Sequence, residues 1–231
     1  RDAVAEYLWE NGSTLDIFRA AFLGDLVAVE RELAAQPDLL HAEDPDDPIY
    51  YVPLLAFAVA GGHADLVSFL IGRGASVAPY SAQLLGLAAK DARKDLLETL
   101  LTHGAEIRAV GVGVFAQVSD LALLTDLLSK GVSPHRRDIN GFPPLVYVAR
   151  GDKGERPDKV QLLLDHGAAV NAVGPRGKTA LHYAATAGHA HVTELLLDRG
   201  ADPTQLDEAG HTPLDLALAA GKFRVVELLK R

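Results

Sequence analysis

Histidines are the residues of this chain whose type and spacing could first suggest chemistry. Nine are present, and His182, His189 and His191 lie close enough in the sequence for a metal site to be considered. A zinc-binding protease helix needs the spacing His-Glu-x-x-His, which is absent. The chain has no cysteine, so it also lacks thiolate ligands and a thiol nucleophile. We therefore expect the histidines to serve the structure, with no metal and no cofactor.

Carboxylates are the other side chains that could do chemistry. Asp91, Asp95, Glu98 and Asp120 are the acids that an enzyme in the middle of the chain would use. Lysine and arginine residues alternate with the first three, a pattern typical of a solvent-exposed helix face. The phosphate-binding GxxxxGK[ST] loop and the GxSxG nucleophile elbow are both absent. We predict no catalytic residues and no enzyme activity, with an enzyme built on these four acids as the alternative.

The elements that would hold any such site repeat along the chain. Near the C-terminus, eight glycine, threonine or apolar residues recur at an offset of 33 residues. They are Gly177, Thr179, Leu181, Ala184, Gly188, Val192, Leu195 and Leu196, which return as Gly210, Thr212, Leu214, Ala217, Gly221, Val225, Leu228 and Leu229. A fixed offset of this kind indicates stacked repeats, each of which buries its apolar face on its neighbours.

The unit at 177–203 predicts a helix, a turn, a second helix and an extended finger. Thr179 can cap the first helix, and Gly188 can end it in the left-handed conformation that a residue with a Cβ resists. An apolar stripe then marks the second helix, which Gly200 closes. The residues that follow, Asp202, Pro203 and the stretch 207–210, are typical of turns.

These patterns resemble the ankyrin repeat family. Thr179-Ala-Leu-His182 and Thr212-Pro-Leu-Asp215 are similar to its helix-opening Thr-Pro-Leu-His, and the Gly-His pairs at 62–63 and 188–189 are similar to its inter-helix turn. The resemblance implies an all-α solenoid of stacked helix-turn-helix units with short β-hairpin-like fingers, in about six to seven repeats that become irregular in the middle. It gives His182 and His189 structural positions. Asn171 matches an asparagine that hydroxylases modify in some family members, but we interpret it as a turn-stabilising residue.

Starting from the regular C-terminal end, we divide the chain into repeats that together form one continuous array. The expected repeats are a partial one that holds only a second helix at 1–12, then 13–44, 45–77, a degenerate one at 78–109, a shortened degenerate one at 110–134, 135–171, 172–204 and 205–231. The repeat at 135–171 carries an insertion, GDKGERP, between its helices. In the shortened repeat, we expect the missing residues to come from the connecting finger, because shorter helices would lose part of their packing stripes.

Charge and hydropathy limit the classes of partner. Residues 1–48 hold twelve acids against three arginines, which accounts for the whole net charge of −9. A nucleic-acid binder needs a clustered basic stripe, which we do not find, so we expect no nucleic-acid partner. No apolar run reaches the length of a membrane span, and the charged first residues do not resemble a signal peptide. We expect a cytoplasmic monomer that binds no membrane.

The resemblance implies a binding face as well as a fold. The family binds partner proteins on a concave surface formed by the fingers and the exposed side of the first helices. Aromatic residues and arginines are enriched among interface hot spots. The expected partner-binding residues on this surface are therefore Tyr50, Tyr51, Arg136, Arg137, Phe142, Arg150 and Arg176. The alternative is that Phe142 and one of the tyrosines only pack within the fingers.

The function expected from these observations is a non-enzymatic module that binds another protein on its concave face. A second possibility is a regulatory or targeting ankyrin segment of a larger enzyme or effector. The absence of methionine and the incomplete first repeat favour this second possibility.

Overall fold

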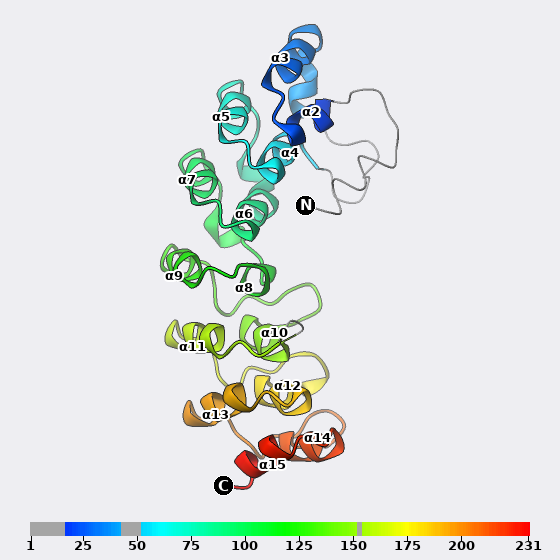
Figure 1. Ribbon diagram of the computed structural model, residues 1–231, viewed down its shortest axis with the longest axis vertical. Helices are drawn as coiled ribbons and strands as arrows, with labels where there is room; N and C mark the ends of the chain where they lie inside the picture. The colour runs from blue at the N-terminus through cyan, green and yellow to red at the C-terminus, as the bar shows by residue number, and fades with distance from the viewer. Residues whose placement is uncertain (1–16, 43–51, 152–153) are drawn as a thin grey trace. The chain divides into compact units, whose positions relative to one another are not determined.

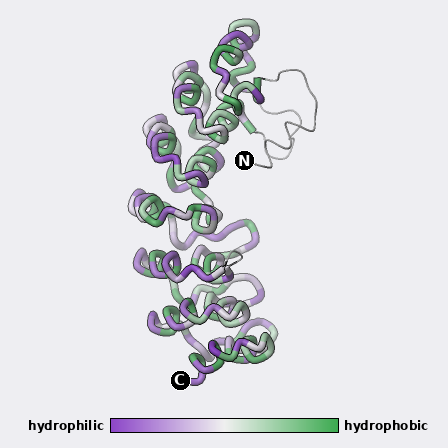
Figure 2. Tube along the Cα trace, in the orientation of Figure 1, coloured by the Kyte–Doolittle hydropathy of each residue, from purple (hydrophilic) through white to green (hydrophobic). Residues whose placement is uncertain are grey.

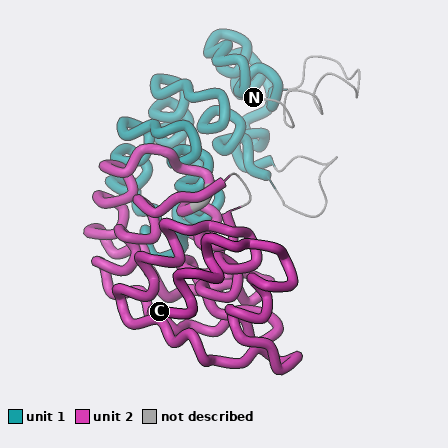
Figure 3. Tube along the Cα trace, turned by 60° about the horizontal axis from the view of Figure 1, so that its bottom comes forward, with its two compact units in different colours: residues 1–110 teal, residues 111–231 magenta. Residues whose placement is uncertain are grey.

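Paired α-helices joined by short turns make up the structure (Figure 1). The computed structural model describes residues 17–42, 52–151 and 154–231. Within these residues there is no β-strand, and an isolated antiparallel bridge joins Val173 to Thr179. The chain divides into two compact units, unit 1 at residues 1–110 and unit 2 at residues 111–231 (Figure 3). The predicted helical repeat fold is confirmed.

Unit 1 contains three helix pairs in its described residues. They are α2 (Ile17–Leu23) with α3 (Leu26–Ala35), α4 (Leu54–Gly61) with α5 (Ala64–Gly72), and α6 (Ser81–Lys90) with α7 (Lys94–Thr102). Short 3-10 helices lie at η1 (Pro37–His41), η2 (Ala78–Tyr80) and η3 (Ile107–Ala109). The first helices pack in sequence, α2 on α4 and α4 on α6, and the second helix α5 packs on α7.

Unit 2 contains four helix pairs in its described residues. They are α8 (Gly113–Gln117) with α9 (Leu121–Ser129), α10 (Pro144–Arg150) with α11 (Pro157–Asp165), α12 (Ala180–Ala187) with α13 (Ala190–Asp198), and α14 (Pro213–Ala219) with α15 (Phe223–Leu229). The first helices pack as one row and the second helices as another (Figure 1). The 3-10 helix η4 (Pro175–Gly177) lies in the connection between α11 and α12. None of the helices in the described parts of the chain is long and apolar enough to cross a membrane.

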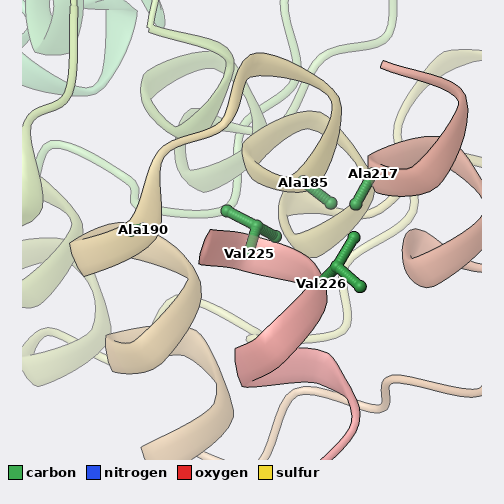
Figure 4. Packing of buried hydrophobic residues seen from close by; sticks show 5 residues of the cluster. All are labelled: Ala185, Ala190, Ala217, Val225 and Val226. Carbon is green, nitrogen blue, oxygen red and sulfur yellow. The ribbon is translucent and has the colours of Figure 1, made fainter. Parts of the chain in front are cut away.

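Small apolar side chains let successive pairs approach closely. Most helices carry both hydrophobic and hydrophilic residues, so that one face can be buried (Figure 2), whereas α4 is apolar along its length and almost completely buried. At the C-terminal end, two valines of α15 pack against alanines of α12, α13 and α14 (Figure 4); the cluster comprises Ala185, Ala190, Ala217, Val225 and Val226. Ala185 and Ala217 are completely buried, and larger side chains there would push the helices apart.

Glycines end the first helices as predicted. Gly62 and Gly188 have φ values of 78° and 83°, in the left-handed region where a Cβ is unfavourable. The histidine that follows each glycine bonds to the preceding repeat. His63 Nε2 donates to the carbonyl of Phe22 (3.0 Å), and His189 Nδ1 donates to that of Ala149 (3.2 Å). The structural interpretation of His189 is therefore confirmed.

His182 links one repeat to the next from a fully buried position. Its Nδ1 accepts from the backbone N–H of Thr179 (3.2 Å) and lies 2.8 Å from the Thr179 hydroxyl. Its Nε2 donates to the carbonyl oxygen of His211 in the following finger (3.1 Å). Burial lowers the pKa of His182 below 6.5, and this effect outweighs the His211 carbonyl and Asp207, which raise it. The ring therefore acts as a neutral hydrogen-bonded bridge between repeats.

Asn171 also joins successive repeats. Its side-chain amide donates to the carbonyl of Gly200 (3.2 Å), and its carbonyl accepts from the N–H of Asp202 (2.9 Å). The interpretation of Asn171 as a turn-stabilising residue is confirmed.

The atypical middle of the chain differs in part from the sequence-based expectation. The 3-10 helices η2 and η3 stand where connecting fingers would be, and only the loss of the finger at η3 was expected from the sequence. However, α8 has five residues against eight in α12, so the first helix is shortened as well. The expectation that only the finger is lost was wrong. Ser81 takes over the linking role here, since its hydroxyl donates to Ala78 and accepts from the N–H of Glu106.

A buried cation holds the short helix α8. Lys159 of α11 is 2% exposed, and its Nζ donates to the carbonyl oxygen of Phe115 at 2.7 Å. The last four carbonyl groups of a helix have no hydrogen-bond partner within the helix, and in the five-residue α8 these are most of its carbonyl groups. Lys159 satisfies one of them, which joins α8 to the next repeat.

The insertion between α10 and α11 contacts the following repeat. His189, the residue before α13, makes no side-chain capping bond. Glu155 supplies the cap instead: its carboxylate accepts from the N–H of Val192 (2.9 Å) and lies 3.1 Å from His191 Nδ1. Burial alone would raise the pKa of Glu155, but these two partners stabilise its charged form and hold the pKa below 4.5.

Replacing Glu155 should destabilise the repeat that follows it. Glu155→Ala leaves the Val192 N–H without its acceptor, and we expect the free energy of unfolding to fall by about 1 kcal/mol at pH 7. Glu194→Ala, an exposed change of the same type in α13, is the control and should stay within about 0.5 kcal/mol of the wild type. Urea unfolding measures both.

The difference in stability between the wild type and Glu155→Ala should decrease at acidic pH. The lowered pKa of Glu155 means that its contribution is complete above pH 4.5 and is lost as the pH falls through the folded-state pKa. A Glu155→Ala variant as stable as Glu194→Ala at pH 7 would show that the cap does not contribute.

Candidate functional site

The finger before α10 is shaped by one aspartate. The N–H of Asp138 donates to the carbonyl of Phe142 (3.0 Å), and its carboxylate accepts from the N–H groups of Asn140 (2.9 Å) and Phe142 (2.8 Å). Gly141 adopts φ 81°, which this tight turn requires. This turn places Phe142 two residues before the start of α10.

Phe142 is the centre of an aromatic cluster that spans two repeats. Its ring meets Tyr147 of α10 edge to face, with centroids 6.2 Å apart, and packs at a tilt against Tyr183 of α12 at 5.8 Å. The Arg150 guanidinium at the end of α10 lies over the Phe142 ring, 5.5 Å from its centroid. Aromatic pairs and cation–π contacts of this geometry are each worth about 1 kcal/mol. They fix the positions of these side chains before any ligand binds.

The next finger carries Arg176 in an unusual backbone conformation. The N–H of Gly174 donates to the carbonyl of Lys178 (2.7 Å), which closes the finger. Arg176 at its tip has φ 59°, which is unfavourable for a residue with a side chain. Its carbonyl accepts from the N–H of Glu208, in the following finger, at 3.1 Å. The Arg176 side chain is exposed to solvent.

Lys178 completes the site beside Tyr183. Its Nζ lies 6.0 Å from the centroid of the Tyr183 ring and 3.9 Å from the carboxylate of Asp207. Burial raises the pKa of Tyr183, and the charges of Arg150 and Arg176 lower it, so both guanidinium groups act on the same phenol. We define the cationic aromatic surface as these six residues: Phe142, Tyr147, Arg150, Arg176, Lys178 and Tyr183.

Of the sequence-predicted site residues, Phe142 and Arg150 are in contact, and Arg176 lies on the next finger, where its charge lowers the pKa of Tyr183. Arg137 lies at the base of the finger that carries Phe142, and its guanidinium donates to the carbonyls of Gly141 (2.8 Å) and Val173 (2.6 Å). Arg137 therefore holds two successive fingers together.

The remaining predicted residues are Arg136, Tyr50 and Tyr51. Arg136 is exposed next to Arg137. Tyr50 and Tyr51 lie outside the residues that the structure describes.

Sequence reasoning missed the two tyrosines of the surface. Tyr147 and Tyr183 both stand six residues after the glycine of the finger turn, at Gly141 and Gly177. A tyrosine at the same position of successive first helices was the signal that could have identified them.

The acids considered for catalysis have a capping role or exposed positions. Asp120 caps α9 by accepting from the N–H of Leu123 (3.1 Å). Asp91, Asp95 and Glu98 lie at exposed positions of the α6–α7 turn and of α7. Outside residues 1–16, 43–51 and 152–153, no group of three or more histidine, aspartate or glutamate side chains could hold a metal ion.

Comparisons with known proteins relate the chain to one family. The family model described as ankyrin repeats (3 copies) matches residues 114–207 and 157–231. The crystal structure of the ankyrin repeat domain of Bcl-3, described as a unique member of the IkappaB protein family, superimposes with a TM-score of 0.72. That likeness has 26% sequence identity and covers 96% of this chain and 100% of that one.

Curated relatives are longer than this chain. Ankyrin repeat protein nuc-2 of Neurospora crassa is 29% identical over 74% of this chain, and the putative palmitoyltransferase ZDHHC13 of Danio rerio is 27% identical over 78%. E3 ubiquitin-protein ligase XB3 of Oryza sativa subsp. japonica is 33% identical over 70%. The matched parts span 16%, 28% and 40% of these relatives' lengths, respectively.

Proposed function

Because the chain belongs to the ankyrin repeat family, we propose that it binds a partner protein through the face formed by its fingers and first helices. Ankyrin repeats are in general modules for protein–protein interaction and are typically not enzymes. The observation that carries the proposal is the cationic aromatic surface, which combines two fingers and two first helices in one place.

The chemistry of this surface suits a protein interface. Arginine and tyrosine are enriched among hot spots because they combine a large contact area with directed polar groups. Arg150 stacks on Phe142, and Arg176 lies on a fingertip that is hydrogen-bonded to the next finger. Binding would therefore restrict few additional rotatable bonds. The φ of 59° at Arg176 is a local strain of the kind that gathers at binding sites.

Removing both exposed guanidinium groups tests this proposal. The 231-residue chain and its Arg150→Ala/Arg176→Ala variant serve as baits in parallel pull-downs, followed by quantitative mass spectrometry. We expect at least one protein to be recovered about tenfold less by the variant, since two hot-spot residues are lost. Arg224→Ala/Lys230→Ala, two exposed cations on or directly after α15, is the control and should capture that protein normally. Equal recovery by all three baits would contradict the proposal.

A second variant separates binding from folding. Arg176→Gly removes the side chain and relieves the positive φ, so we expect the free energy of unfolding to rise by about 0.5 kcal/mol while the partner binds more weakly. Thermal unfolding and the same pull-down measure the two effects. Weaker binding by a more stable protein has no explanation in misfolding.

The relatives favour a second candidate function. Two of them bear the names of enzymes, a putative palmitoyltransferase and an E3 ubiquitin-protein ligase, and both are longer than the matched region. The chain would then be the regulatory or targeting segment of a larger enzyme or effector. The complete open reading frame tests this candidate: a catalytic domain joined to the repeats supports it, and a frame that encodes repeats alone rejects it.

The expectations of a cytoplasmic monomer that binds neither nucleic acid nor membrane stay predictions, as do the repeat boundaries.

A further inference from the structure

We propose that the segment bound by the cationic aromatic surface is an acidic stretch of a separate protein. This inference rests on the proposed function and adds the chemistry of the partner.

Most charged side chains on the face that carries the cationic aromatic surface are basic. Across the fingers at 135–143 and 172–178 and along α10 and α12, one side chain is acidic and five are basic, namely Arg136, Arg137, Arg150, Arg176 and Lys178. Unit 2 as a whole is balanced, with fourteen acids and fourteen lysines and arginines. The excess of positive charge is therefore a property of this face and not of the unit.

Three anionic groups lie near this face: two are hydrogen-bonded within their own fingers, and the third, Glu208, is exposed beside Arg176, to whose carbonyl its N–H donates. The carboxylate of Asp138, the one acid in the set, accepts two backbone N–H bonds inside its own finger. Asp207, which is close to Lys178, has a nearly buried side chain and accepts from the N–H groups of Ala209 and His211 (both 2.9 Å). These bonds lower the pKa of Asp207, the His211 bond most, so its carboxylate stays charged and pairs with Lys178.

The guanidinium of Arg137 donates to neutral groups, which do not compensate its positive charge. The carbonyl oxygens of Gly141 and Val173 orient it without cancelling its positive charge. The Phe142 ring orients the Arg150 guanidinium, which lies over it. Cations that are fixed in place before binding attract carboxylates at a smaller cost in side-chain entropy.

Apolar groups beside the cations favour a peptide over a nucleic acid. Ile139, at the tip of the first finger, is fully exposed, and Val173 in the next finger is 37% exposed. The rings of Phe142, Tyr147 and Tyr183 are half-buried against one another, whereas single-stranded nucleic acids stack on open aromatic faces. An acidic segment that also carries apolar side chains could contact both kinds of group.

Selection from random peptides displayed on phage tests this inference with the whole 231-residue chain. We expect the recovered peptides to contain about twofold more Asp and Glu than the unselected library. A recovered peptide, synthesised and titrated, should bind about tenfold more weakly to Arg150→Glu/Arg176→Glu and should weaken similarly when salt rises from about 0.1 to about 0.5 M. Arg224→Glu/Lys230→Glu makes the same change of charge away from the face and should bind normally.

Other outcomes overturn the inference in distinguishable ways. Neutral or basic peptides that still depend on Arg150 and Arg176 reject an acidic partner and leave the proposed function intact. Peptides that bind both double variants normally, or no enrichment at all, count against the proposed surface as well. Displacement of the peptide by a single-stranded RNA that binds more tightly would assign the face to nucleic acid. A dimer in sedimentation velocity that dissociates in Arg150→Glu/Arg176→Glu would assign it to a second copy of this chain.

Discussion

His182→Ala is expected to lower the free energy of unfolding by about 3 kcal/mol, since it leaves a cavity and removes three hydrogen-bond contacts at once. The backbone N–H of Thr179 and the carbonyl of His211 would both lose their partner. His211 lies in the finger after α13, so the change also uncouples two repeats. Urea unfolding at pH 7.5 measures the loss.

His135→Ala is the matched control for this change. His135 is exposed, and its replacement should shift the free energy of unfolding by no more than about 0.5 kcal/mol. If both alanine variants were equally stable, the buried bridge between repeats would not be a source of stability.

The pH profile gives an independent readout of His182. An unfolded chain binds a proton at this residue near pH 6.5, whereas the buried ring binds it only at lower pH. Between these values the unfolded state holds more protons, so stability falls as the pH decreases below about 6.5. The His182→Ala variant should lose this part of the slope, and an unchanged slope would contradict the lowered pKa.

Gly61→Ala is the second change expected to have a large effect. A Cβ built at Gly61, the last residue of α4, would lie 2.2 Å from the carbonyl oxygen of Phe22 in α2. It would also lie 2.6 Å from the His63 ring, which donates to that same carbonyl. The backbone cannot move aside without separating the two helices, so we expect a loss of about 3 kcal/mol.

Gly86→Ala tests the same chemical change where space is available. Gly86 lies within α6, and a Cβ there would meet no atom within 4 Å. Alanine is the better helix former, so this variant should be more stable by about 0.5 to 1 kcal/mol. Urea unfolding followed by circular dichroism compares the two. A Gly61→Ala variant at least as stable as the wild type would mean that α2 and α4 do not approach as described.

The regular part of the fold could be predicted because each feature depends on local sequence. The left-handed Gly188, the turn at Asp138 and the stripes of both helices follow from residues within one repeat. The helix cap from Glu155 and the bond from Lys159 to α8 could not, since each joins residues more than 35 positions apart. In the sequence, both look like ordinary surface charges.

The candidate site could be predicted in part for the same reason. Position within the repeat selected Phe142, Arg150 and Arg176 as candidates. It could not tell that Arg137 would bond to the backbone of two fingers, because this depends on how close successive fingers lie. The missed Tyr183 contacts Phe142 across two repeats, a contact that only the stacking of α10 and α12 creates.

Hydrogen–deuterium exchange of the chain bound to the protein recovered by pull-down tests the central claim most directly. We predict slower exchange at 138–150 and 174–187, which hold the two fingertips, α10 and α12, with no change in α11 and α13. Arg150→Ala/Arg176→Ala should abolish this protection. Protection confined to α11 and α13, or to residues of unit 1, would contradict the claim that the cationic aromatic surface binds the partner.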